Sequence, residues 1–143
     1  MIATSDGQGA KIICVIKTKT WQGKQSMCRI DGGITITPGH PIKFNQKWVY
    51  PRSISEPETI ACPHFYNLIV DRVHIAQLNG IEVILLGHNY THGILKHEYY
   101  GSQRVIEDLK KVKGFDDGMV ELTQRQDGTI ERANEKRQFK TPE

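Results

Sequence analysis

The sequence predicts a mostly β domain with one short helix towards its C-terminal end. Short runs of β-branched and other apolar residues recur along most of the chain, and glycine-containing turns separate them. The spacing of apolar residues that is typical of an amphipathic helix follows Ser102. At 143 residues the chain has the length of one domain and can form a substantial hydrophobic core.

The first half of the chain contains several of these strands. Residues 10–17 include an apolar run from Ile12 to Ile16, which predicts a buried strand. Residues 34–37 alternate apolar and hydroxyl side chains, which is typical of a half-buried strand. Residues 44–48 are expected to connect a hairpin whose return strand holds Trp48, Val49 and Tyr50. A polar connection over residues 51–57 and a further strand over residues 65–70 complete this half.

The clearest local signal is Asn79-Gly80, which lies between the β-prone runs 73–78 and 81–86. A two-residue type I′ hairpin turn requires positive φ at both positions, and Asn and Gly tolerate it best. With this pair as the loop, His74 lies opposite Leu85. Side-chain alternation places His74 on one face with Ala76 and Leu78, so we expect its ring to be at least half buried.

The last third contains the helix and a second hairpin. Ser102 is expected to cap a helix that Gly114 ends, with an apolar stripe of Val105, Ile106, Leu109 and Val112. Residues 119–123 and 129–132 flank Asp127-Gly128 as a hairpin. Residues 133–143 are polar and charged, so we expect a disordered tail after a domain that spans residues 1–132.

Composition excludes several classes of protein. The net charge of +3 is spread along the chain without a basic block, which does not favour nucleic-acid binding. No apolar run approaches membrane-spanning length, and the first residues lack the layout of a signal peptide. Cys14, Cys28 and Cys62 form no C-x-x-C pair and cannot all be bridged. They are expected to be reduced thiols of an intracellular, cytoplasmic protein.

The stretch "ITITPGHPIKF" holds a candidate catalytic pair. Thr37 ends the predicted strand, Pro38-Gly39 forms a tight turn, and His40 follows three residues after the threonine. Either this is a turn without chemistry, or a hydroxyl group and an imidazole are directed at one point.

These residues resemble a known family. Thr37-Pro38-Gly39-His40 matches the T-x-x-H block of Hint domains, the self-processing fold shared by inteins and hedgehog C-terminal domains. "FYNLIVDRVHIAQLNGIEVILLGHN" is similar to the later Hint block. "HGILKHEYYGSQRVIEDLKKVKGFDDGMVEL" resembles the extension of the Vint subtype, found in eukaryotic proteins with von Willebrand A modules. The resemblance covers about residues 9–122 and implies a horseshoe of curved antiparallel strands.

The resemblance also implies roles for five residues. In Hint domains a first-residue Cys or Ser attacks its own preceding carbonyl, so the leaving nitrogen requires a proton. His40 would donate that proton, and Thr37 would position it. His74 would assist proton movement at the C-terminal step, while His88 and Asn89 match the histidine and asparagine at which an intein ends its chain.

Three features depart from the family pattern. No Cys or Ser stands at the expected start, so the chain is expected to begin inside the domain, and Cys14 in mid-strand is interpreted as a core residue. Asn67 takes the place of an aspartate and cannot ionise. Tyr90 follows Asn89 within the matched extension and is a poor nucleophile, which argues against full splicing, although cleavage after Asn89 stays open.

The sequence predicts neither a cofactor nor a metal site. Cys62, His64, His88, His92 and His97 could gather around zinc, but they lack paired-ligand spacing and are interpreted as turn and surface residues. Gly7-Gln8-Gly9 lacks the third glycine and βαβ setting of a dinucleotide-binding loop.

Two functions from different classes therefore stay open. The first is a self-processing domain, inert as this fragment, whose partner is its own polypeptide or a missing N-terminal Hint segment. The second is a non-catalytic Hint-like scaffold or interaction domain of a larger protein. The absence of a first strand would leave an unpaired edge, for which we expect a strand-edge dimer or capture of a peptide.

Overall fold

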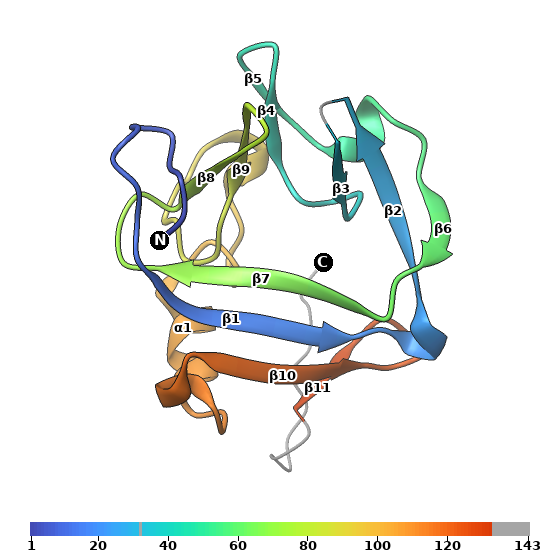
Figure 1. Ribbon diagram of the computed structural model, residues 1–143, viewed down its shortest axis with the longest axis vertical. Coiled ribbons are helices and arrows are strands. Elements are labelled where there is room, and N and C mark those ends of the chain that lie inside the picture. Colours follow the sequence, from blue (N-terminus) through green and yellow to red (C-terminus); the bar gives the residue numbers. More distant parts are fainter. Residues whose placement is uncertain (32, 133–143) are drawn as a thin grey trace.

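The computed structural model describes residues 1–31 and 33–132, which form three β-sheets and one α-helix (Figure 1). The strands are β1 (Ile12–Lys19), β2 (Lys24–Ile30), β3 (Ile34–Ile36), β4 (Ile42–Phe44), β5 (Lys47–Val49), β6 (Glu58–Ala61), β7 (His64–Val70), β8 (Ile75–Leu78), β9 (Ile81–Ile84), β10 (Met119–Gln124) and β11 (Ile130–Arg132). The helix is α1 (Gln103–Lys110), and the short 3₁₀ turns are η1 (Trp21–Gly23), η2 (Pro51–Ser53), η3 (Gly93–Leu95) and η4 (Phe115–Asp117). The predicted mostly β fold with one short helix is confirmed.

The largest core lies between the first sheet and α1. This sheet has the order β11-β10-β1-β7; β1 pairs antiparallel with β7 and parallel with β10. Helix α1 packs its buried side chains Val105, Ile106 and Leu109 against Cys14, Ile16 and Val120 of the sheet. Cys14 is fully buried, which confirms that it is a core residue. The predicted apolar run is buried on one face only, because alternation along β1 leaves Ile13 38% exposed.

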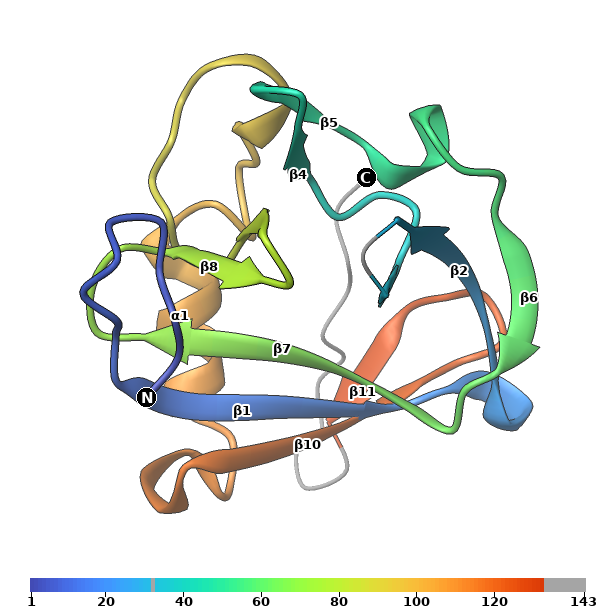
Figure 2. The same ribbon diagram turned by 45° about the horizontal axis from the view of Figure 1, so that its top comes forward.

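Two further sheets complete the β structure. The order β3-β2-β6 forms one sheet and β5-β4-β9-β8 the other. Figure 2 shows β2 and β6 on one side of the molecule and β8 on the opposite side, with the long strands β1, β7 and β10 below them. A small core of Cys28, Ile30, Ile36, Ile42 and Val83 joins β2 and β3 to β4 and β9.

Strands β2 and β6 were not predicted from the sequence. Residues 24–30 read KQSMCRI and residues 58–61 read ETIA, and neither segment has a clear alternating pattern. The two segments pair with one another over Lys24↔Ala61 to Met27↔Glu58, so each receives its backbone hydrogen bonds from a distant part of the chain. Strand β3 also ends one residue earlier than predicted, which leaves Thr37 in the turn.

The predicted Asn79-Gly80 turn and the Ser102 cap are confirmed. Asn79 and Gly80 have φ of 49° and 82°, as a type I′ turn requires. The hairpin connection predicted over residues 44–48 is shorter in the structure: Asn45 and Gln46, both with positive φ, form it, and the return strand β5 ends at Val49, before Tyr50. Gly128 lies in the loop between β10 and β11. The Ser102 hydroxyl accepts a hydrogen bond from the Arg104 N–H at 3.2 Å. The helix ends at Lys110, four residues before Gly114, and Val112 is buried just beyond it.

The first ten residues fold back against the third sheet. Ile2 pairs with Ala10, and Thr4 pairs with Ala76 on the outer edge of β8. The Ser5 N–H donates to the Ile75 carbonyl at 3.2 Å. Both views show this loop beside β8 (Figures 1 and 2). The edge of β8 is therefore covered by the chain's own N-terminal residues.

Three expectations concern other regions or properties. The predicted tail, residues 133–143, lies outside the described residues. Cys14, Cys28 and Cys62 are free thiols, the first two of them buried. Within the described ranges, no helix has the length and apolar character needed to span a bilayer.

Candidate functional site

The Thr37–His40 turn links two different sheets. Thr37 follows β3, which pairs with β2, whereas His40 precedes β4, which pairs with β5 and β9. The His40 N–H donates to the Thr37 carbonyl at 3.3 Å, and the Arg52 N–H donates to the Pro38 carbonyl at 3.2 Å. These two bonds close the turn and hold it against η2. Thr37 and His40, the predicted pair, are thus hydrogen-bonded to one another through their main chains.

The imidazole of His40 is anchored on β9. Its Nε2 lies 2.5 Å from the carbonyl oxygen of Ile84, so Nε2 carries a proton and donates it to the carbonyl. Burial lowers the pKa of His40, and the bond to Ile84 partly opposes that effect. The neutral ring therefore has its proton on Nε2, which leaves Nδ1 as the basic nitrogen.

His74 reaches the same end of β9 from the neighbouring strand. The pairing Ile75↔Ile84 and the bond from the Leu85 N–H to the His74 carbonyl, 2.9 Å long, confirm that His74 lies opposite Leu85. The ring is half-buried, as predicted. Burial lowers the pKa of His74, while a bond to the Leu86 backbone and the charge of Asp71 raise it. Its Nδ1 is buried and has no hydrogen-bond partner among the described residues.

His88 joins these histidines from the loop that follows β9. Burial lowers its pKa first, and positive charge on His74, His97 and His40 lowers it further. His40 and His74 both bond to the backbone at the end of β9, at the Ile84 carbonyl and the Leu85 N–H, and the His88 ring and the His97 carbonyl both lie next to Gly101. We call these four residues the histidine cluster (His40, His74, His88 and His97). The cluster brings together three of the five predicted residues, which come from separate segments of the chain.

His97 is the member of the cluster that sequence reasoning missed as a site residue. Its Nδ1 accepts hydrogen bonds from the N–H groups of Tyr99, at 3.2 Å, and Tyr100, at 2.9 Å. Its ring contacts that of Tyr100, with centroids 4.9 Å apart. The sequence signal was a histidine close to aromatic residues in the extension, but a turn histidine shows the same pattern.

Asn89 lies beside the cluster and is held by its backbone. Its N–H donates to the Gly101 carbonyl at 2.7 Å, and the Gly87 N–H donates to the Tyr100 carbonyl at 2.8 Å. Asn89 is exposed and has φ of 62°, a left-handed conformation that asparagine tolerates. The Nδ1 of His88 accepts the Tyr90 N–H at 2.9 Å. The extension thus clamps the residues on both sides of His88.

Comparison with known proteins now identifies the family. The sequence profile of Vint, described as a Hint-domain, matches residues 1–137. The chain belongs to the Vint family of Hint domains. No curated protein matches this Vint domain. The mostly β architecture with one short helix is consistent with a Hint-type fold. Self-processing of the intein-like kind is a capability of the Hint family.

The Vint domain has a pocket next to its cluster, and it is largely apolar. A cavity of about 380 Å³ is lined by Trp48, Tyr90, His92, Gly93, Ile94 and Leu95. It adjoins His88 through Tyr90, whose ring stacks on the His88 imidazole with centroids 5.3 Å apart. In residues 1–31 and 33–132, no group of three His, Cys, Asp or Glu side chains is arranged to hold a metal ion. Imidazole, whose ordinary pKa lies near neutrality, can accept and donate protons, which is the chemistry that the histidine cluster offers.

Proposed function

We propose that this Vint domain cleaves a peptide bond of its own polypeptide by an N–S or N–O acyl shift. The attacking cysteine or serine is supplied by a segment N-terminal to Met1. The observation that carries the proposal is the setting of His40, whose Nε2 is anchored 2.5 Å from the Ile84 carbonyl. Its Nδ1 makes no hydrogen bond within the described ranges, so one nitrogen fixes the ring and the other is available to move a proton.

The proposed step balances with His40 as the proton carrier. The thiol or hydroxyl attacks the carbonyl carbon of the preceding residue, a C–S or C–O bond forms, and the C–N bond breaks. Nδ1 accepts the proton of the attacking group and passes it to the leaving nitrogen. Because burial lowers the pKa of His40, the ring is neutral near pH 7 and able to accept that proton.

The cysteines of the described chain support an external nucleophile. Cys14 and Cys28 are fully buried, and their thiols donate to the carbonyls of Val15 and Ser55. Burial raises the pKa of both thiols, which disfavours the reactive thiolate. The Cys62 thiol donates to the His64 carbonyl at 3.2 Å and lies at the start of β7.

The second candidate is a non-catalytic scaffold. The clamp over Gly87 and Asn89 favours it, because both N–H groups are bonded to the extension and the chain continues through Tyr90 without an end at Asn89. In this function the histidine cluster is a packed junction between two sheets, and replacement of His40 affects stability alone.

The experiment is complementation with a nucleophile. A segment with a cysteine at the junction is joined to the N-terminus behind a reporter, and release of the reporter is followed in the presence of thiol. His40→Ala should slow release on the order of 10²–10⁴-fold, the usual worth of acid–base catalysis. His92→Ala, at an exposed histidine, is the matched control, and Asn89→Ala should also leave release unchanged. No release from the completed protein supports the scaffold, and release that does not depend on His40 would contradict the role proposed for His40.

A further inference from the structure

The turn between β7 and β8 is strained immediately before His74. Val73 has φ of 43°, in the left-handed region that β-branched residues rarely adopt. Its side chain packs against the core of Ile75, Ile84 and Leu95. A strained residue persists only where its surroundings hold it in place, so the contacts of this turn decide where β8 begins.

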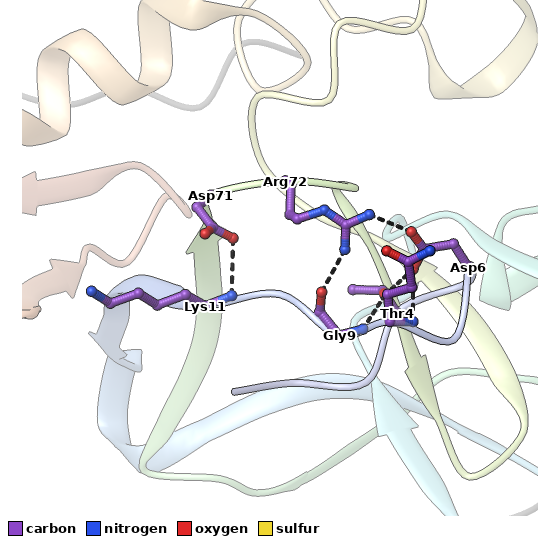
Figure 3. Close-up of polar contacts among 7 residues, drawn as sticks. Thr4, Asp6, Gly9, Lys11, Asp71 and Arg72 are labelled. Atoms are coloured by element: carbon purple, nitrogen blue, oxygen red, sulfur yellow. Dashed lines mark hydrogen bonds and ion pairs between the residues drawn. The ribbon is translucent and has the colours of Figure 1, made fainter.

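Two residues of the turn are bonded to the N-terminal loop, which here includes Lys11 at the start of the connection to β1 (Figure 3). Asp71 accepts the Lys11 N–H at 2.9 Å, and its own N–H donates to the Lys11 carbonyl at 3.1 Å. The Arg72 guanidinium donates to the Gly9 carbonyl at 2.6 Å and forms an ion pair with the Asp6 carboxylate. The turn is thus attached to the loop at both of the residues that precede Val73.

The loop that receives Arg72 is itself rigidly bonded. Thr4 is fully buried; its hydroxyl donates to Asp6 at 2.5 Å and accepts the Gly9 N–H at 3.0 Å. Asp6 also accepts the Gln8 N–H at 3.1 Å. The bonds from Thr4, Gln8 and Arg72 lower the pKa of Asp6 to about 2, so its charge persists at any ordinary pH. Arg72 therefore meets a fixed carboxylate and a fixed carbonyl.

The same loop also contacts the strand after His74. Besides the bond from Ser5 to Ile75, the Gln77 N–H donates to the Ala3 carbonyl at 2.9 Å. His74 is thus held by the loop on both sides along the chain. Its own ring adds little restraint at Nδ1, which is buried without a partner among the described residues.

We propose that Arg72 is a positioning residue: held by Asp6 and the Gly9 carbonyl, it fixes the strained Val73 turn and thereby sets where the His74 imidazole lies in the histidine cluster. The effect of Arg72 on the cleavage rate rests on the proposed function. Its effect on the position of the His74 ring does not, because that position can be measured in the chain without any cleavage.

The first arm of the test is nitrogen-15 and proton NMR of the ring of His74 and of the Val73 backbone. In Arg72→Ala the Val73 coupling constant should leave the range of a positive φ, the His74 ring signals should shift, and its titration midpoint should rise towards the ordinary value of 6.5. Arg29→Ala is the matched control, since it removes another exposed ion pair, Arg29–Glu58 at 3.1 Å, on β2 and β6. Unchanged His74 and Val73 signals in a folded Arg72→Ala variant would overturn the proposal.

Two further variants keep the test decisive. Asp6→Asn removes the charge but keeps an oxygen for Thr4 and Gln8, so it replaces Arg72→Ala if that variant fails to fold. Val73→Asn should lessen the effect of Arg72→Ala, because asparagine adopts positive φ with little strain. If Arg72→Ala displaces His74 equally whether residue 73 is valine or asparagine, Arg72 does not act through the strained turn.

The second arm uses the completed protein. Because Arg72 is proposed to act only through His74, Arg72→Ala should slow release of the reporter no more than His74→Ala does, and the double variant should be no slower than His74→Ala. Additive losses would contradict positioning. If the completed protein does not cleave at all, the proposed function fails, and the NMR arm still decides whether Arg72 positions His74.

Discussion

Three histidines of the cluster are buried enough to resist protonation. Burial lowers the pKa of His40, His74 and His88 below the ordinary 6.5. The unfolded chain therefore binds more protons than the folded one just below that value, so acid favours unfolding there. Protonation of Asp6, whose pKa is about 2, affects stability only at much lower pH.

The resulting prediction concerns stability near neutral pH. The free energy of unfolding should be at its full value above about pH 6.5, the ordinary pKa of histidine, and should decrease as pH falls from there towards the lowered pKa values. Urea unfolding followed at a series of pH values measures this slope. His40→Asn should reduce the slope, and stability that is constant or increases over this acid range would contradict the burial of neutral imidazoles.

The His88 ring packs directly against Gly101. A Cβ at residue 101 would lie 2.8 Å from His88 Cε1 and 2.9 Å from the His97 carbonyl oxygen. Gly101→Ala should therefore decrease the free energy of unfolding by about 1–3 kcal/mol, the usual range for overpacking, and shift the His88 ring signals. Gly39→Ala is the control, because its Cβ would meet only the flexible end of Arg52 at 3.3 Å. Equal effects at the two glycines would show that residue 101 has room for a methyl group.

At the scale of elements, the β8–β9 hairpin holds both His40 and His74 in place. His74 precedes β8, and the Ile84 carbonyl that anchors His40 ends β9. The turn at Asn79-Gly80 sets the register of the two strands, and a slip of one residue would move each side chain to the other face. The geometry of the cluster therefore depends on a turn at the far end of the hairpin.

Substitution of Gly80 tests this dependence. A Cβ there would meet nothing within 4 Å, so any loss reflects φ of 82° alone. Gly80→Ala should decrease the free energy of unfolding by about 1–2 kcal/mol, the cost of a left-handed residue, and Gly80→Asn should cost less. Thermal and urea unfolding compare the two variants. A larger loss with asparagine than with alanine would contradict a conformational cause.

At the scale of the whole molecule, the open strand edges matter most. Among the strands in residues 1–31 and 33–132, β7 is the longest at the edge of a sheet, and Tyr66 on it is 57% exposed. We expect association through this edge, with a second copy or an extended peptide, because a strand edge of this length without a neighbouring strand is a template for pairing. Analytical ultracentrifugation over a range of concentrations should show a dimer that Tyr66→Lys removes. Tyr90→Lys, at a tyrosine 46% exposed outside any strand, should not. A monomer at every concentration would contradict this expectation.

The local features of this protein followed from the sequence by itself. Residues such as Asn79-Gly80 and Ser102 specify a turn or a cap through their own conformational preferences, which act over a few residues. The burial of His74 and its register with Leu85 followed from that turn and from strand alternation. The order of the T-x-x-H block, the later block and the extension also sufficed to indicate a Vint-type Hint domain.

Only the tertiary structure decided the rest. Strands β2 and β6 form because each finds a partner, since neither has a strong pattern of its own. The parallel pairing of β1 with β10, more than a hundred residues apart, decides where α1 packs. Contacts between distant segments also bring His97 into the cluster. They likewise attach Arg72 to Asp6 and Gly9. Such contacts form when the hydrophobic core closes, and no short-range preference of these residues encodes them.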